Sequence, residues 1–377
     1  SFTQRNTRCA RKPCRVLQNT PFRFDSLRDT TKEYPDFRKG KHMIVALGAF
    51  DGFHLGHQSL FKAASSLSSV KSDTWGVVTF SPHPGQVLFP AASRLIFSEE
   101  EKHVLESYLG IPKVIRILFD LSLATVGHIP FLELLFSIPS LSGIVVGDNF
   151  RFGAGRTGDT NAIRAACDRA RLIFRSLPRI KIGNRVISSS AIRRLIQCGY
   201  LEEAREWLGH HYFLSGRVVH GNGRGRALGF PTANIAVPIW KILPPEGVYA
   251  ALAVIRGERK IMRCALSIGE NPTFGDVAER RIEAHILDGE SDFYEKNMCI
   301  LPLVFLRESV RFATPAELKK RISEDVDTVS NLNEMHPGFS TAENFLLSLS
   351  CKHESDSPGR IWSYDAQAHI LRPRGSG

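Results

Sequence analysis

Residues 43–57 have the sequence MIVALGAFDGFHLGH, and this stretch decides the fold of the first half of the chain. Its first five residues are all apolar, which predicts a buried strand. The following segment, residues 58–67, has apolar side chains at helical spacing and predicts an amphipathic helix. His54 and His57 are therefore expected at a strand-to-helix turn, near the first turn of the helix.

A turn of this kind is a favourable place for a phosphate group. Unpaired backbone N–H groups and the positive end of the helix dipole gather there, and two imidazoles three residues apart lie on one side of the helix. The glycines Gly48 and Gly56 let the backbone approach an anion closely. These features predict that both histidines donate hydrogen bonds to one phosphate, and that the stretch around Asp51 is a nucleotide site.

Two other interpretations of the histidines are open. A lone histidine near a helix start is more often a cap or a surface residue, although the full motif G-x-F-D-G-x-H-x-G-H directly after a strand is far more specific than H-x-G-H. A zinc site is the weaker alternative, because the Glu-x-x-His or cysteine ligands that usually complete one are missing from the motif.

Composition limits the class of protein and of partner. The chain has 377 residues, enough for two domains, and an ordinary 43% of hydrophobic residues. Its formal net charge of +11 favours nucleic acid or phosphate-rich small molecules as partners, with a merely solvated basic surface as an equal alternative. No apolar run approaches the ~20 residues of a membrane span. Seven cysteines without a C-x-x-C pair argue against a disulfide framework or zinc module and indicate a reducing compartment.

Strands and helices alternate over residues 43–209, which predicts a doubly wound parallel α/β sheet with right-handed crossovers. Further strands are expected at residues 74–80, 114–119 and 143–147. The turn Ser81-Pro-His83-Pro84 places His83 at the carboxyl edge of this sheet, where ligands bind. The loop after the strand 143–147, in which Asn149 precedes glycines and arginines, suits the sugar and phosphates of a nucleotide.

Hydroxyl side chains precede a further helix near residue 190. Ser188 and Ser189 come before Ala-Ile-Arg193, a pattern typical of a helix N-cap. The functional interpretation is that the hydroxyls, the N-terminal amides and Arg193 hold the triphosphate of a second substrate. The alternative is a cap with no further role.

The pattern changes near Tyr212 to short alternating runs separated by Gly and Pro, which predicts a small antiparallel barrel. Its strands are expected at residues 214–220, 247–255, 264–268, 282–287 and 299–306, and a helix at 315–326. Gly223, Gly225 and Arg226 belong to a glycine-rich cationic loop in this region, which suits phosphate groups.

Three polar residues of the barrel region have the chemistry of a phosphoryl-transfer site. Thr232 and Asn234, two apart on an expected strand, face the same way and offer the hard oxygen atoms that Mg²⁺ prefers. Glu283 alternates with apolar residues on another strand, and a carboxylate at the mouth of a barrel can take a proton from a hydroxyl nucleophile. For Glu283 alone, an outward-facing strand residue is the more common alternative.

Taken together, the motifs from about residue 43 to residue 326 resemble those of bifunctional riboflavin kinase/FAD synthetases of the prokaryotic type. They are GAFDGFHLGH (48–57), TFSPHP (79–84), VGDNFRFG (146–153), ISSSAIR (187–193), GFPTAN (229–234), SIGENPTF (267–274) and IEAHI (282–286). The resemblance implies a Rossmann-like FMN adenylyltransferase domain over 42–209, where FMN attacks the α-phosphate of ATP to give FAD and pyrophosphate. It also implies a riboflavin kinase barrel over 210–335, where riboflavin attacks the γ-phosphate of ATP.

The resemblance also implies roles for single residues. His54 and His57 would hold the ATP phosphates and stabilise transition-state charge, and Glu283 would be the catalytic base of the kinase. The implied ATP- and phosphate-binding residues are Gly48, Asp51, Gly56, Asn149, Ser188, Ser189, Arg193, Gly223, Gly225 and Arg226. Thr232 and Asn234 would bind Mg²⁺ together with ATP.

Some features depart from the family pattern. Ser189-Ser190 replaces the usual Ser-Thr, Ser267 replaces a frequent Asn, and Glu295 follows Tyr294 where a glycine is usual. The Arg-rich, acid-poor residues 1–41 predict a disordered leader, with a transit peptide as the alternative. Residues 336–377 are expected to be a loosely helical and then irregular tail without an assigned role.

Two rival functions are open. One is a nucleotidyltransferase of the same fold class that acts on another phosphate, but such enzymes lack the Pro-Thr-Ala-Asn module. The other is an RNA-binding barrel, which would need aromatic residues clustered on a strand face. The expected partners are therefore ATP, riboflavin and FMN, without nucleic acid or membrane, in the cytoplasm or, if the leader is a transit peptide, in an organelle. The sequence leaves the oligomeric state open.

Overall fold

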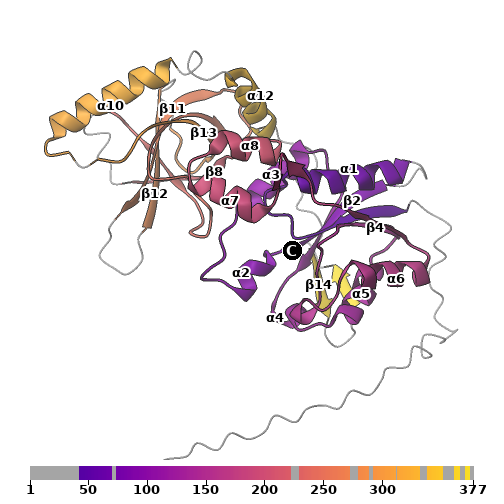
Figure 1. Ribbon diagram of the computed structural model, residues 1–377. Coiled ribbons are helices and arrows are strands. Elements are labelled where there is room, and N and C mark those ends of the chain that lie inside the picture. The colour runs from indigo at the N-terminus through magenta and orange to yellow at the C-terminus, as the bar shows by residue number, and fades with distance from the viewer. Residues whose placement is uncertain are drawn as a thin grey trace, which may run out of the picture. The chain divides into compact units, whose positions relative to one another are not determined.

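Strand β1 (Met43–Leu47) lies inside a mostly parallel sheet in the computed structural model (Figure 1). It pairs in parallel with β2 (Thr74–Ser81) and β4 (Leu141–Gly147), which in turn pair with β3 (Val114–Leu118) and β5 (Ile173–Leu177). The structure describes residues 42–69, 74–221, 229–271, 279–287, 292–310, 312–331, 338–350, 361–365 and 370–373.

Helices cover both faces of this sheet, so every side chain of β1 is buried. Ile44 and Ala46 pack with α1 (Leu55–Ser69), α3 and α7, whereas Met43, Val45 and Leu47 pack with α5 and α6. The doubly wound parallel sheet predicted from the sequence is confirmed. The other helices of this half are α2 (Pro84–Leu88), α3 (Glu99–Tyr108), α4 (Leu121–Ala124), α5 (His128–Phe136), η2 (Ala154–Arg156), α6 (Thr160–Ala170), α7 (Ser189–Gln197) and α8 (Leu201–Leu208), with the short strands β6 (Lys181–Ile182) and β7 (Arg185–Val186).

Helix α1 begins three residues earlier than the apolar periodicity indicates. The backbone carbonyl of His54 accepts hydrogen bonds from the N–H groups of His57 (2.7 Å) and Gln58 (3.0 Å), which start the helix at Leu55. His54 therefore directly precedes the helix and His57 lies in its first turn. This placement brings both imidazoles to the positive end of α1.

The second half forms a closed antiparallel barrel, which confirms the predicted class. Its strands pair in the order β10-β11-β12-β9-β8-β13. Their bounds are β8 (Leu214–Val219), β9 (Ala233–Ala236), β10 (Gly247–Ile255), β11 (Met262–Asn271), β12 (Glu279–Ile286) and β13 (Asn297–Arg307). Two helices, α10 (Pro315–Ser330) and α12 (Phe339–Ser350), pack against β10, which is buried along its whole length.

The end of the chain differs from its expected irregular course. Strand β14 (Ile361–Asp365) pairs in parallel with β3, and β15 (Ile370–Pro373) pairs antiparallel with β14. Figure 1 shows β14 in yellow among the indigo and magenta elements of the sheet. Strands this short have little periodicity of their own, and their pairing depends on the free edge that β3 offers.

Sheet and barrel belong to one unit of the chain, residues 41–377. Leu95, just before α3, pairs with the barrel connection between β9 and β10. The N–H of Leu95 donates to the carbonyl of Trp240 (3.0 Å), and the N–H of Ile242 donates to the carbonyl of Leu95 (2.8 Å). Within the part of the chain that the structure describes, no helix combines the length and apolar character that crossing a membrane requires.

Candidate active sites

His54 and His57 form a stacked pair where β1 leads into α1. Their ring centroids are 3.6 Å apart and their planes differ by 18°, and the backbone N–H of His57 donates to Nδ1 of His54 (3.3 Å). Because that nitrogen accepts a hydrogen bond, the proton of His54 resides on Nε2, which is left as a donor. Gly56 permits this packing, since a Cβ there would lie 3.0 Å from the His54 ring.

Burial keeps both imidazoles neutral. It lowers the pKa of His54 to about 4, although the charge of Asp51 opposes the shift. It also lowers the pKa of His57 well below its usual value, with smaller contributions from His54 and Lys102. Nδ1 of His57 is buried and has no hydrogen-bond partner among the described residues. A buried polar atom without a partner costs free energy, so we interpret this atom as one that bonds to a ligand.

The predicted phosphate clamp is tied to the same loop through Asp51. The Ser189 hydroxyl donates to the backbone carbonyl of Asp51 (2.8 Å), and Arg193 Nε donates to its carboxylate (3.1 Å). The carboxylate is buried and also accepts the N–H of Ile96 (3.0 Å). We infer that Asp51 acts by orienting Arg193, because its own oxygens are engaged within the protein and carry the wrong charge for a phosphate.

The other residues predicted for this site lie at the same edge of the sheet. Ser188 caps α7 by accepting the N–H of Ala191 (3.3 Å). Asn149 is exposed just after β4, and because β4 is parallel to β1, it follows the strand end that neighbours Gly48. His83 caps α2, where its Nδ1 accepts the N–H of Gly85 (3.0 Å).

His54 and His83 predict a fold that is sensitive to acid. Burial lowers both pKa values from 6.5 to about 4. Between pH 6.5 and about 4, the unfolded chain therefore binds protons that the folded chain excludes, so the free energy of unfolding falls as the pH falls through this window. We expect the urea midpoint to drop between pH 7 and pH 4.5, and to drop less in His54→Gln. Equal pH dependence in both proteins would contradict this account.

In the barrel, Asn234 and Glu283 lie opposite each other on neighbouring strands. They are register partners of β9 and β12, and Ser267 of β11 pairs with Glu283 from the other side. Since Ile282 and Ala284 are buried, Glu283 lies on the face away from the barrel core. Its half-buried carboxylate forms an ion pair with Arg281. The structure thus places the predicted base beside one of the two predicted metal ligands.

Gly221 shapes the surroundings of Asn234. A Cβ at residue 221 would lie 2.2 Å from the amide nitrogen of Asn234, so any residue other than glycine would displace the Asn234 side chain. Thr232 is half-buried and lies two residues away, just before β9 begins. The hydroxyl and amide oxygens of this cradle fit a hard cation such as Mg²⁺. The predicted loop residues Gly223, Gly225 and Arg226 lie outside the described residues.

Two protein-family models match the chain, one for each half. The FAD synthetase model matches residues 37–191, and the riboflavin kinase model matches residues 208–333. A bifunctional riboflavin kinase/FMN adenylyltransferase of Listeria monocytogenes is 32% identical over 298 residues, which cover 78% of this chain and 93% of the relative. The chain belongs to the bifunctional riboflavin kinase/FMN adenylyltransferase family.

Further comparisons agree with this family membership. The bifunctional riboflavin kinase/FMN adenylyltransferase of Escherichia coli K12 is 33% identical over 286 residues, covering 75% of this chain and 90% of the relative. Among solved structures, a macrolide-efflux protein from Streptococcus pneumoniae superposes with a TM-score of 0.68 at 28% identity. That likeness covers 78% of this chain and 96% of the other.

Lys102 is a buried lysine near the two site histidines His57 and His83 that the sequence pattern does not indicate. Helix α3 buries it to 4% exposure, and its ammonium group pairs with Glu99 (2.8 Å). Its positive charge contributes to the lowered pKa values of His57 and His83. A lysine in an acidic helical turn resembles a surface residue, and only the tertiary structure brings its charge near the two histidines.

Glu295 occupies the position where bifunctional riboflavin kinase/FMN adenylyltransferases lead us to expect glycine. Its φ of +66° is a left-handed conformation, which costs a non-glycine residue roughly 1–2 kcal/mol. Its ion pair with Arg217 is exposed and adds little. We expect Glu295→Gly to be more stable than Glu295→Ala by about 1 kcal/mol in urea denaturation, since both lose the ion pair and only alanine keeps the strain. Equal stability would show that the turn is unstrained.

Proposed function

We propose that this chain phosphorylates riboflavin to FMN in its barrel and adenylylates FMN to FAD in its sheet domain. The observation that carries the proposal is the presence of two separate groups of phosphate-chemistry residues. His54 and His57 lie in the loop that Asp51 ties to Arg193, and Glu283 lies beside Asn234 on the barrel. We assign residues 42–209 to FMN adenylyltransfer and residues 210–335 to riboflavin phosphorylation.

In the sheet domain, the phosphate of FMN attacks the α-phosphorus of ATP and pyrophosphate leaves. The neutral imidazoles of His54 and His57 donate hydrogen bonds to phosphate oxygens as charge develops on the leaving group. Nε2 of His54 holds the proton for this task because its Nδ1 accepts a backbone N–H. Arg193, in the middle of α7, neutralises further negative charge. The attacking phosphate is already an anion, so no side chain has to remove a proton.

In the barrel, the terminal ribityl hydroxyl of riboflavin attacks the γ-phosphorus of ATP and ADP leaves. Glu283 takes the hydroxyl proton, and Arg281 holds its carboxylate through the ion pair. Thr232 and Asn234 would hold Mg²⁺ through their side-chain oxygens, and the ion would supply positive charge to the phosphates when bound. Positioning and charge neutralisation account for most of the rate in such a transfer, so one base is sufficient.

Gly221→Ala is expected to raise the KM for MgATP in riboflavin phosphorylation by about tenfold, because the added methyl group displaces the Asn234 amide. FMN adenylylation in the same preparation should be unchanged. Steady-state kinetics of both reactions measure the KM for MgATP and the rate of FMN adenylylation. Gly127→Ala is the matched control, since its Cβ would make only an ordinary van der Waals contact with Pro130 (3.7 Å). Equal kinase kinetics in the two variants would remove Asn234 from the site.

The proposal includes small-molecule substrates only, namely ATP, riboflavin and FMN. It places the protein in a reducing compartment such as the cytoplasm, which is supported by the free thiols of Cys167, Cys198 and Cys299. Nucleic acid and membranes form no part of it.

A flavin conversion assay tests the proposed function. The purified chain is incubated with riboflavin, ATP and Mg²⁺, and the flavins are separated by chromatography. We expect FMN and then FAD; with FMN as the starting flavin, we expect FAD and pyrophosphate without ADP. Omission of Mg²⁺ in the presence of a chelator should stop FMN formation. Riboflavin and FMN that both remain unaltered would overturn the proposal.

A further inference from the structure

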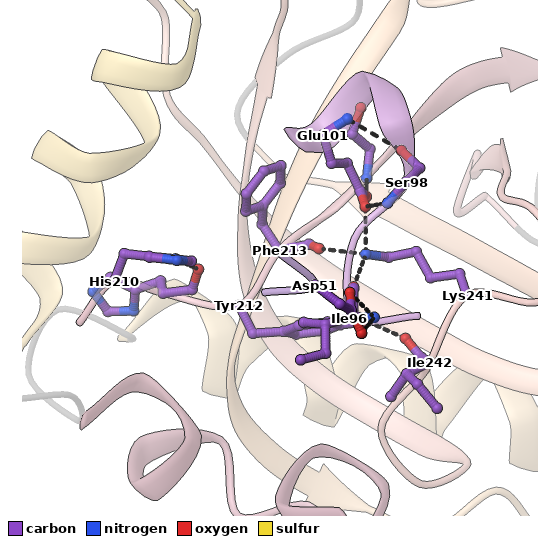
Figure 2. Close-up of polar contacts among 11 residues, drawn as sticks. Asp51, Ile96, Ser98, Glu101, His210, Tyr212, Phe213, Lys241 and Ile242 are labelled. Atoms are coloured by element: carbon purple, nitrogen blue, oxygen red, sulfur yellow. Dashed lines mark hydrogen bonds and ion pairs between the residues drawn. The ribbon is translucent and has the colours of Figure 1, made fainter. Parts of the chain in front are cut away.

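Lys241 is a lysine of the barrel half that is buried among residues of the sheet half. It lies on the connection between β9 and β10 and has 0% side-chain exposure. Figure 2 shows its ammonium group between Glu101, the Ile96 carbonyl and the Phe213 carbonyl. The donor-to-acceptor distances are 2.6, 2.8 and 3.1 Å, so all three N–H donors of an ammonium group are satisfied.

Its partner Glu101 is equally buried and equally satisfied. Its carboxylate accepts the N–H of Ser98 (2.7 Å) and the N–H of Ser215 (2.7 Å) in addition to Lys241. The ammonium group also lies 4.8 Å from the ring centroid of Phe97. A buried ion pair adds little to stability compared with apolar residues of the same volume. The pair is therefore better explained by what it positions than by the stability it gives.

The Lys241–Glu101 pair holds one end of a chain of hydrogen bonds that leads to the adenylylation site. Lys241 holds the carbonyl of Ile96, and the N–H of Ile96 donates to the carboxylate of Asp51 at 3.0 and 3.3 Å. The same carboxylate accepts Arg193 Nε at 3.1 Å. The single residue Ile96 therefore connects the barrel lysine, through its carbonyl, to Asp51, through its N–H (Figure 2).

The backbone around Ile96 is fixed by the barrel as well. Leu95 exchanges two hydrogen bonds with the segment 240–242. Leu95, Ile96 and Phe97 are each at most 1% exposed. A segment held this tightly passes a displacement on to its partners, because packed interiors deform little.

We propose that Lys241 is a positioning residue for FMN adenylylation, holding Asp51 and through it Arg193 in the geometry that the ATP phosphates require. This inference rests on the proposed function of the sheet domain. It means that the adenylylation site depends on a side chain that the kinase half supplies.

The test compares Lys241→Met with Glu101→Gln/Lys241→Met in the full chain. The double variant leaves no unpaired buried charge, so it keeps the fold if the single variant does not. In both, we expect kcat for FMN adenylylation to fall about 100-fold, as for other small misplacements in active sites, while riboflavin phosphorylation and the KM for FMN stay within about twofold.

Two further measurements separate positioning from a merely structural role. In an Arg193→Ala background, removal of Lys241 should cost less than about threefold, because both changes act through one group. Hydrogen exchange of the Ile96 amide should be at least about tenfold faster in the double variant. Arg307→Met is the matched control: it breaks the buried Arg307–Asp325 pair between β13 and α10 (2.7 Å) and should leave adenylylation unchanged.

Several outcomes would overturn the inference. These are wild-type adenylylation in the double variant, a parallel loss of both activities, or losses that multiply with Arg193→Ala. If the wild-type chain itself makes no FAD, the proposed function fails separately. The exchange of the Ile96 amide then still decides whether Lys241 holds this segment, since an unchanged rate overturns the inference.

Discussion

Replacing His57 with alanine is expected to lower the rate of FMN adenylylation about 10²- to 10³-fold, which is the usual effect of removing one donor to a developing negative charge. Riboflavin phosphorylation should continue at the wild-type rate. His57 belongs to the stacked pair at the start of α1, and its Nδ1 is buried without a hydrogen-bond partner among the described residues. Rates of FAD formation from FMN and of FMN formation from riboflavin, measured on one preparation, provide the check.

The loss should not come from unfolding. Since no hydrogen bond from Nδ1 is broken, His57→Ala should melt within a few degrees of the wild-type protein. His57→Gln, which keeps a polar group of similar reach, should recover part of the rate. A folded His57→Ala protein that forms FAD at the wild-type rate would remove this histidine from the reaction.

Replacing Glu283 with alanine is expected to abolish FMN formation, with a loss of roughly 10²- to 10⁴-fold for the removal of a general base. Conversion of FMN to FAD should be unaffected. The carboxylate lies opposite Asn234 on the face of β12 away from the barrel core. Initial rates from riboflavin and from FMN, each with saturating MgATP, distinguish the two steps.

Glu283→Gln sharpens this test, since it keeps the shape of the side chain and removes only its basicity. The control is Glu258→Ala, which deletes another half-exposed glutamate of the barrel together with its ion pair to Lys296 (3.1 Å). It should have wild-type kinetics. If Glu283→Gln phosphorylates riboflavin normally, the base must be sought elsewhere on the barrel.

Local sequence signals were sufficient for the fold, whereas the roles of the candidate site residues stay predictions. The strand 43–47 is entirely apolar, which requires that both faces of its sheet are covered. In the structure, helices cover both faces and all five residues are buried. The alternation around Glu283 correctly predicts one buried and one open face of β12.

Contacts between distant segments could not be predicted in the same way. Lys241 is a buried cation whose ion-pair partner Glu101 lies 140 positions earlier in the chain, and no periodicity records such a pairing. The ion pair between Asp51 and Arg193 joins residues 142 positions apart, and the sequence around Asp51 does not indicate that this arginine neutralises it. Strands β14 and β15 depend on the edge of β3, which exists only after the sheet has formed.

Mixing the two single variants tests the central claim of two independent sites most directly. His57→Ala should convert riboflavin to FMN and stop there, and Glu283→Ala should accept only FMN. Supplied together with riboflavin, ATP and Mg²⁺, the two proteins should produce FAD after a lag, during which free FMN made by the first protein accumulates for the second. If the mixture forms no FAD although each variant performs its own half-reaction, or if either substitution removes both activities in a folded protein, the account of two separate sites is wrong.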